Sequence, residues 1–226
     1  NSASLNPTAA VTLEIWFYIT SFSSVNNLLF DNSLAGTTFS YYVDIITENG
    51  TASFRWFSVI GGTGRNITST TTKCPVRSWN QFMATYDGTQ ILLFLNGSQL
   101  ANSITGISGA LGTNTGQLRI GRSATGAVSA SLNGFIYRPK IYSVGCNLAE
   151  HQDRYYRDIT SASLQAATVL DLAMTEGSGS TIADISGNNN TATLGTSTTW
   201  NSANTPFKAR SASSGRQATS GRLLVT

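Results

Sequence analysis

The sequence predicts an all-β protein built as a two-sheet antiparallel sandwich with one short helix. Three observations lead to this fold class: segments in which apolar and polar residues alternate, turn signals about eight to twelve residues apart, and a low content of charge. Hydrophobic residues make up 40% of the 226 residues and charged residues only 11%, against roughly 25% charged residues in an average soluble domain. The composition therefore excludes coiled coils, most helical bundles and highly charged disordered chains.

The first predicted strand covers residues 11–19, VTLEIWFYI. Apolar side chains at every second position share one face: Val11, Leu13, Ile15, Phe17 and Ile19. The opposite face carries Thr12, Glu14, Trp16 and Tyr18. A period of two is the signature of a strand, so this segment is expected to bury one face and to present aromatic side chains on the other.

Further strands follow at regular intervals. Residues 39–45 and 53–59 are predicted to pair through a turn at 48–50, and residues 79–86 pair with 91–95 through Asp87 and Gly88. Asp-Gly and Asn-Gly steps tolerate the positive φ of tight hairpins, which predicts a β-meander. Shorter strands are expected at 117–121, 134–142 and 169–174, and an extended piece at 182–185.

One helix is predicted over residues 148–158. Asn147 and Glu150 have the spacing of a capping box, and apolar or aromatic residues recur at helical intervals at Leu148, His151, Tyr155 and Ile159. His151 is the only histidine, which excludes structural zinc and most Ser-His-Asp or metalloprotease sites. It is expected to be a face residue of the helix rather than a catalytic base.

The two cysteines, Cys74 and Cys146, leave two possibilities open. In an oxidising compartment they could form one disulfide, which stabilises by about 4 kcal/mol in the chain-entropy model. Alternatively, they are two reduced thiols that are buried separately.

The positive charge is concentrated at the carboxyl end. The net charge is +3, and without Lys208, Arg210, Arg216 and Arg222 it would be −1. We therefore expect no specific nucleic-acid partner. Residues 201–226 are interpreted as a Ser/Gly/Arg-rich extension, in which the composition of 201–221 predicts mobility and the apolar end at 223–225 is expected to be held in place. The sequence contains no run of about 18 apolar residues, so no membrane-spanning helix is predicted. The first residues lack a signal-peptide pattern, so a secreted chain would be in its processed form.

Four segments resemble a known family. They are SASLNP at 2–7 with VTLEIW at 11–16, WNQFMATYDG at 79–88, LFLNG at 93–97, and the stretch from NG at 133–134 through IY at 141–142 to LAE at 148–150. Together they are similar to the laminin-G-like jelly rolls of the concanavalin A-like lectin/glucanase superfamily. The resemblance covers most of residues 1–160 and implies a jelly-roll sandwich.

A fifth segment has an unexpected place in the chain. DLAMTEGSG at 171–179 and ADISGN at 183–188, ending at Trp200, resemble the opening segment of such domains, yet here they follow the closing helix. The chain is therefore predicted to be circularly permuted, with a jelly roll over 1–200 whose opening strand comes from residues 169–200. This strand would complete either its own sandwich or that of a neighbouring copy, and the second outcome would build a filament or array.

The resemblance also implies calcium as the possible cofactor, held by Asp184 and Asn188. Against this, FIYR stands at 135–138, where the family usually carries acidic residues. The alternative for Asp184 is an Asx turn.

Sugar binding would use exposed aromatic side chains with polar groups around them. The candidates are Trp16, Tyr18, Tyr42 and Trp56. The alternative is that these strand aromatics belong to the core or to an interface. The expected partner is a glycan or a cell-surface protein, with self-association of the chain.

No enzymatic activity is expected. The glutamates are Glu14, Glu48, Glu150 and Glu176, and none of them begins the Glu-x-Asp-x-x-Glu strand of related glucanases. We therefore expect a non-enzymatic adhesion or carbohydrate-recognition jelly roll, extracellular or on a cell or virion surface, displayed in a repeated assembly. The alternative is a structural subunit of a filament or coat, assembled by intermolecular strand complementation without a ligand.

Overall fold

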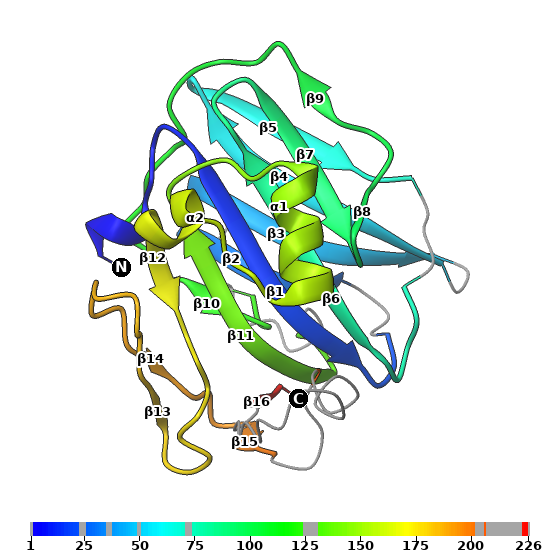
Figure 1. Ribbon diagram of the computed structural model, residues 1–226, viewed down its shortest axis with the longest axis vertical. Coiled ribbons are helices and arrows are strands. Elements are labelled where there is room, and N and C mark those ends of the chain that lie inside the picture. The colour runs from blue at the N-terminus through cyan, green and yellow to red at the C-terminus, as the bar shows by residue number, and fades with distance from the viewer. Residues whose placement is uncertain are drawn as a thin grey trace.

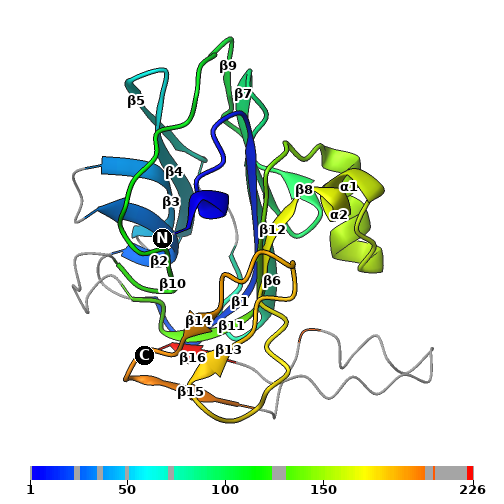
Figure 2. The same ribbon diagram turned by 90° about the vertical axis from the view of Figure 1, so that its left-hand side faces the viewer.

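Two antiparallel β-sheets face each other, with the main hydrophobic core between them (Figures 1 and 2). A computed structural model of the chain describes residues 2–22, 26–34, 38–48, 51–70, 74–123, 131–201, 206 and 223–225. Within these residues, no helix is both long enough and apolar enough to cross a membrane.

Sheet A has the strand order β15-β16-β11-β1-β6-β7-β8, with β12 on β11 and β9 on β7. Its strands are β1 (Val11–Ile19), β6 (Trp79–Tyr86), β7 (Gln90–Leu95), β8 (Ser98–Gln99), β9 (Ile104–Thr105), β11 (Gly134–Tyr142), β12 (Thr168–Asp171), β15 (Thr198–Trp200) and β16 (Leu223–Val225). Sheet B has the order β10-β2-β3-β4-β5. Its strands are β2 (Asn26–Leu34), β3 (Thr38–Glu48), β4 (Thr51–Ile60), β5 (Thr63–Thr68) and β10 (Arg119–Ile120).

The remaining elements are short. They are the 3₁₀ turn η1 (Ala3–Leu5), the helix α1 (Leu148–Gln152), the π-helical turn η3 (Asp153–Arg157), the helix α2 (Ala162–Ala166) and the hairpin of β13 (Thr181–Ile182) with β14 (Ala192–Thr193). The predicted antiparallel sandwich is confirmed, and the predicted strands around 11–19, 39–45, 53–59, 79–86, 91–95 and 134–142 are present. Strands β2 and β5 were not expected.

The inner faces of both sheets supply the core. All five apolar residues of the predicted inner face of β1 are buried there, as the alternation predicted. From the facing strands, Phe54 of β4 stacks on Phe82 of β6 with ring centroids 4.6 Å apart. The carboxyl-terminal part of the chain fills the same core with Leu170, Leu172, Met174 and Ile182, so the core is not complete without it.

Helices cover the outer face of sheet A, as Figure 2 shows on the side away from sheet B. The predicted helix is confirmed: the Asn147–Glu150 capping box starts α1, and the helix continues as η3. A second apolar cluster lies beneath the helical layer and contains Met83, Phe94, Tyr142, Cys146 and Leu164. The expected aromatic outer face of β1 is therefore largely covered, and Trp16 keeps only 4% exposure.

The outer edge of β11 is paired with segments from the far end of the same chain. At one end of β11, Phe135 is opposite Leu224 of β16, and at the other end Ile141 is opposite Leu170 of β12. These pairings satisfy backbone groups that would otherwise leave an open sheet edge. The predicted contribution of residues near 169–174 to the sandwich is thus made within one chain, whereas a circular permutation stays a prediction.

The predicted alternative of a disulfide between Cys74 and Cys146 is wrong. Both thiols are free and buried. Cys74 belongs to the core between the sheets, whereas Cys146 lies in the cluster beneath the helical layer, so sheet A separates them. Burial raises the pKa of both thiols, which keeps them protonated and unreactive at neutral pH. The prediction that residues 201–221 are mobile concerns a segment that lies almost entirely outside the described residues. The apolar end at 223–225 forms β16 on the edge of β11.

Candidate functional site

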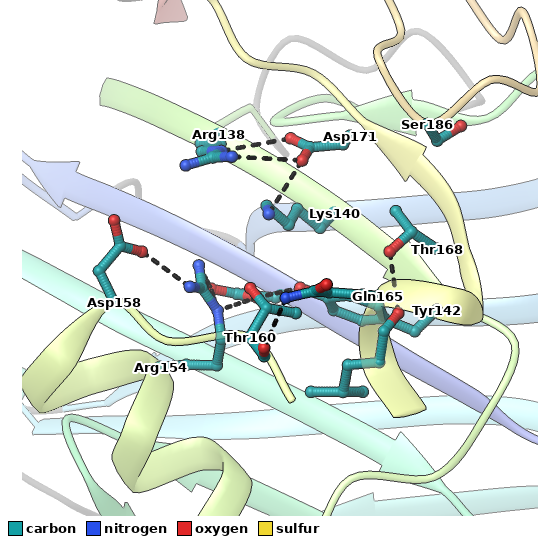
Figure 3. A network of polar contacts seen from close by, with 12 residues as sticks. Arg138, Lys140, Tyr142, Arg154, Asp158, Thr160, Gln165, Thr168, Asp171 and Ser186 are labelled. Carbon is teal, nitrogen blue, oxygen red and sulfur yellow. Dashed lines mark hydrogen bonds and ion pairs between the residues drawn. The ribbon is translucent and has the colours of Figure 1, made fainter. Parts of the chain in front are cut away.

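The outer face of sheet A is closed by a buried ion pair between Glu14 of β1 and Arg154 of η3. Arg154 donates from Nη2 to Oε1 of Glu14 at 2.8 Å and from Nε to both carboxylate oxygens at 3.1 Å. Gln81 and the hydroxyl of Tyr142 donate to the same carboxylate at 2.9 and 2.7 Å. Figure 3 shows Arg154 between the helical layer and the sheet, with a further bond to Asp158.

The Glu14 carboxylate is a structural group. Burial alone would raise its pKa, but the charge and hydrogen bonds of Arg154, helped by Lys140 and Tyr142, hold the pKa at about 2. A carboxylate that has no exposed surface and accepts this many donors has no access to substrate and no proton to give near neutral pH. Its role is to attach the helical layer to the sheet.

His151 lies in the same layer. Its Nε2 accepts a hydrogen bond from the backbone N–H of Gly97 at 2.9 Å, and its ring stacks on Phe94. Burial lowers the pKa of His151 to about 4, and the nearby charge of Glu14 opposes only part of this effect. The expectation of a helix-face residue is confirmed, and that face is turned toward the sheet.

This buried imidazole predicts a pH dependence of stability. The unfolded chain binds a proton at His151 below about pH 6.5, but the folded chain binds it only near pH 4, so unfolding is favoured as the pH falls through this window. We expect the Tm to fall between pH 6.5 and 4. His151→Gln, which keeps an acceptor for Gly97, should have the flatter profile in thermal scans at constant ionic strength. Parallel profiles would contradict the assignment.

A second charged cluster fixes β12 on the edge of β11. Asp171 of β12 lies 2.9 Å from Nζ of Lys140 and 3.3 Å from Nε of Arg138, and Figure 3 shows both cations directed at its carboxylate. The backbone N–H of Asp171 donates to Oδ1 of Asp184 at 2.9 Å. Opposite charge and strand pairing together select this position for β12.

The loop that follows does not fit a calcium site. Oδ1 of Asp184 accepts from the N–H groups of Asp171 and Ser186, and Oδ2 accepts from the Ser186 hydroxyl and the Asn190 N–H. Asn188 directs its Nδ2 at the carbonyl of Thr168. With donors around both carboxylate oxygens, a cation would have to displace the hydrogen bonds that hold the loop. The contact with Ser186 N is the Asx turn named as the alternative.

In the part of the chain that the structure describes, no three His, Cys, Asp or Glu side chains lie close enough together to hold a metal ion.

Two of the four aromatic candidates are enclosed. Trp56 has no exposed surface and lies in the core between the sheets. Trp16 stacks against Tyr155 of the helical layer with ring centroids 5.7 Å apart. The prediction that Trp16 and Trp56 belong to an exposed sugar-binding surface is therefore wrong. Tyr18 is half-buried and packs edge-to-face with Trp79 and Phe135 at the end of β1.

Tyr42 lies on the outer face of sheet B, which none of the described helices covers (Figure 2). Strand pairing aligns one residue from each of the five strands into a row. The row consists of Arg119, Asp31, Tyr42, Phe57 and Asn66. Residues directly opposite each other in antiparallel strands present their side chains on the same face, so the row joins a cation, a carboxylate, two aromatic rings and an amide.

A neighbouring row reinforces Tyr42. Arg55 is paired with Asp44 across β3 and β4 and donates to its carboxylate at 3.0 and 2.6 Å. The Tyr42 hydroxyl donates to the same carboxylate at 3.0 Å, and the Arg55 guanidinium lies 5.6 Å from the centre of the Tyr42 ring. Phe39 contacts both Tyr42 and Phe57 edge-to-face. The result is a preorganised aromatic and polar surface.

The pKa values agree with this arrangement. Burial, followed by the charge of Asp44 and the hydrogen bond to it, raises the pKa of Tyr42 to about 12, so the phenol stays a donor. Burial raises the pKa of Asp44 although Arg55 opposes it. We call this surface the sheet B face and define it by Phe39, Tyr42, Asp44, Arg55, Phe57 and Asn66.

Several solved structures share this architecture. A Bacteroides ovatus protein assigned as carbohydrate binding matches with a TM-score of 0.60 and 18% identity over 83% of this chain and 52% of its own. The enzymatically active domain of tailspike protein 2 from bacteriophage CBA120 matches with a TM-score of 0.56 and 13% identity over 74% of this chain and 26% of its own. The chain thus spans about half of the first protein and a quarter of the second, and these identities show a shared fold.

No curated protein matches the sequence closely enough to count as a relative. A family model described as the concanavalin A-like lectin/glucanases superfamily matches residues 1–150. The resemblance inferred from the sequence motifs is confirmed over that range. Because the family model matches well over half of the 226 residues, the chain belongs to this superfamily.

Proposed function

We propose that the protein is a non-enzymatic carbohydrate-recognition module that binds glycans on the sheet B face. The observation that carries this proposal is the Phe39, Tyr42 and Phe57 cluster beside the Arg55–Asp44 pair on the one broad sheet face free of the described helices.

This surface suits the chemistry of sugars. A pyranose has an apolar C–H face that packs on aromatic rings and a rim of hydroxyl groups that donate and accept hydrogen bonds. Phe57 and Tyr42 supply half-buried rings, Arg55 keeps N–H donors beyond those given to Asp44, and the exposed Asn66 can donate and accept. Strands lie about 4.8 Å apart, so the accessible part of the row, from Tyr42 of β3 to Asn66 of β5, extends about 10 Å, enough for a short oligosaccharide.

The carboxylates of this face are arranged for binding rather than hydrolysis. A retaining glycosidase needs one carboxylate as nucleophile and a second carboxyl group as acid. Asp44 is committed to two hydrogen bonds from Arg55, and Asp31 accepts from the Ser33 hydroxyl at 2.6 Å. Both aspartates are almost fully buried. Their role in the proposal is to orient Arg55 and the strand row.

The proteins with similar folds support the proposed glycan partner and the proposed location. The Bacteroides ovatus structure is assigned to carbohydrate binding, and the tailspike belongs to a bacteriophage. We propose an extracellular, cell-surface or virion-surface location with a glycan partner, in a repeated assembly. The alternative is a structural subunit of a filament or coat, in which β12 or β16 pairs with β11 of a neighbouring copy instead of β11 of its own chain.

Replacing the central aromatic residue tests the binding site. A glycan array identifies the bound sugar, and calorimetry with that sugar then compares the variants. We expect Tyr42→Ala to weaken binding at least about tenfold, which corresponds to about 1.4 kcal/mol. Tyrosines at the centre of an interface are enriched among the residues whose truncation costs about 2 kcal/mol or more. Asn66→Ala, at an exposed strand position, should weaken it less.

Two tyrosines elsewhere are matched controls. Tyr156 of η3 is 57% exposed on the helical layer, and Tyr18 belongs to the aromatic cluster of sheet A. Tyr156→Ala and Tyr18→Ala should bind as the unmodified chain does. Loss of binding in Tyr18→Ala with full binding in Tyr42→Ala would move the site to sheet A, and a silent array would remove the carbohydrate function.

A further inference from the structure

A separate cavity of about 840 Å³ lies where the carboxyl-terminal segment meets sheet B. One wall comes from residues 117–120 and 122, a segment that contains β10. Another wall comes from residues 189–198, which contain β14. The family match ends at residue 150, so a large part of this cavity is made by sequence outside the matched region. Its volume is in the range of small-molecule sites.

The cavity is cationic. Arg119 and Arg122 belong to its lining, and none of the described residues that line it is Asp or Glu. In the described part of the chain, neither arginine forms an ion pair with a carboxylate. Arg119 is aligned with Asp31 in the strand row of the sheet B face, whereas Nη1 of Arg122 lies 3.9 Å from the position that a Cβ on Gly195 would take. Arg122 is therefore the charge that faces the wall of residues 189–198.

The walls of the cavity combine polar and apolar side chains. Four of its apolar lining residues, Leu170, Leu172, Met174 and Ile182, are each at most 2% exposed, whereas Leu118, Ile120 and Leu194 are half-buried. The walls carry hydroxyl and amide side chains, among them Asn189, Thr193 and Thr196. A ligand would therefore meet hydrogen-bonding groups and a guanidinium beside apolar side chains, a combination that suits the hydroxyl groups and the C–H faces of a sugar.

We infer that this cavity binds the carboxylate of an acidic sugar residue, with Arg122 as the group that recognises the acid. A guanidinium matches a carboxylate through two parallel N–H donors, and the surrounding hydroxyl and amide groups match the hydroxyls of a single sugar. This second site adjoins the β10 end of the strand row, because Arg119 belongs to both. Arg122 lies outside that row, so the inference does not rest on the function proposed for the sheet B face.

Gly195 provides the decisive variant. A Cβ at this position would have no atom closer than 3.9 Å, so side chains can be added without a clash. Gly195→Asp places a carboxylate next to Arg122 and should compete with the ligand, whereas Gly195→Ala fills similar space without charge. Arg122→Gln removes the cation itself, and Arg157→Gln, at a side chain 68% exposed on the helical layer, controls for the loss of one positive charge.

The full chain and these variants are titrated by calorimetry with α2,3-sialyllactose and with tri-galacturonic acid. Lactose and methyl-esterified tri-galacturonic acid are the uncharged comparators. We expect at least one acidic probe to bind more tightly than its comparator. That affinity should fall about tenfold or more in Gly195→Asp and Arg122→Gln and stay unchanged in Gly195→Ala and Arg157→Gln, with all melting curves similar.

Three results would overturn the inference: no binding of either acidic probe, equal binding of charged and uncharged forms, or full affinity in both Gly195→Asp and Arg122→Gln. If acidic probes lose affinity only in Tyr42→Ala, the acid lies on the sheet B face. That result would contradict the cavity site and support the proposed function, so the two failures can be told apart.

Discussion

Arg154→Ala is expected to lower the free energy of unfolding by about 3–5 kcal/mol. The Glu14 carboxylate beneath Arg154 has no exposed surface, and the variant would leave it buried without its cation. Removing one partner of a buried ion pair is costly for this reason, even where the intact pair contributes little. Urea denaturation followed by tryptophan fluorescence measures the difference directly.

Two further variants separate charge burial from general damage to the helical layer. The double variant Glu14→Leu with Arg154→Met removes both charges, so it should be more stable than Arg154→Ala alone. Arg157→Ala breaks a solvent-exposed pair with Asp153 and should cost at most about 1 kcal/mol. If Arg154→Ala were no more harmful than Arg157→Ala, the pair would not hold the helical layer as described.

Ending the chain after Ala167 is expected to abolish folding of the remaining sandwich. The truncated chain lacks four buried core residues, Leu170, Leu172, Met174 and Ile182. Removing such side chains singly costs about 2–5 kcal/mol each, and the total stability of a domain is about 5–15 kcal/mol. The truncation also opens the edge of β11, which favours aggregation. Soluble yield and urea unfolding of the fragment are the measurements.

A longer fragment is the matched control. Ending the chain after Trp200 keeps β12, β13, β14 and all four core residues. It removes residues 201–226, and with β16 it removes the strand that pairs with β15. This fragment should be soluble and unfold cooperatively. A cooperative, monomeric fragment of residues 1–167 would show that the first part of the chain closes a sandwich alone.

The sequence predicted best those strands that have one face in the core. In β1, β3 and β4 the face toward the core takes apolar residues at every second position, and this alternation is visible without a structure. Strand β2 was missed because register shifts at Leu28/Phe30 and Asn32/Ser33 interrupt its period. Strand β5 carries only one buried residue, Ile67, so its pattern is weak.

The site was predicted only in part, because a single strand pattern does not show what lies above a face. Trp16 and Tyr42 have similar local patterns, yet Trp16 is covered by η3, which follows more than 130 residues later. The pairing of Asp44 with Arg55 could have been predicted from the sequence. The turn expected at 48–50 sets Glu48 opposite Thr51, and counting back along both strands places Asp44 opposite Arg55 and Tyr42 opposite Phe57.

The most direct test of the account is to map the glycan selected by the array onto the ¹⁵N-labelled chain by NMR. We expect the largest amide shift changes in β3, β4 and β5, around Tyr42, Arg55, Phe57 and Asn66, with little change in α1 and η3. Shift changes that centre on the helical layer, or on the Tyr18 cluster of sheet A, would contradict recognition by the sheet B face.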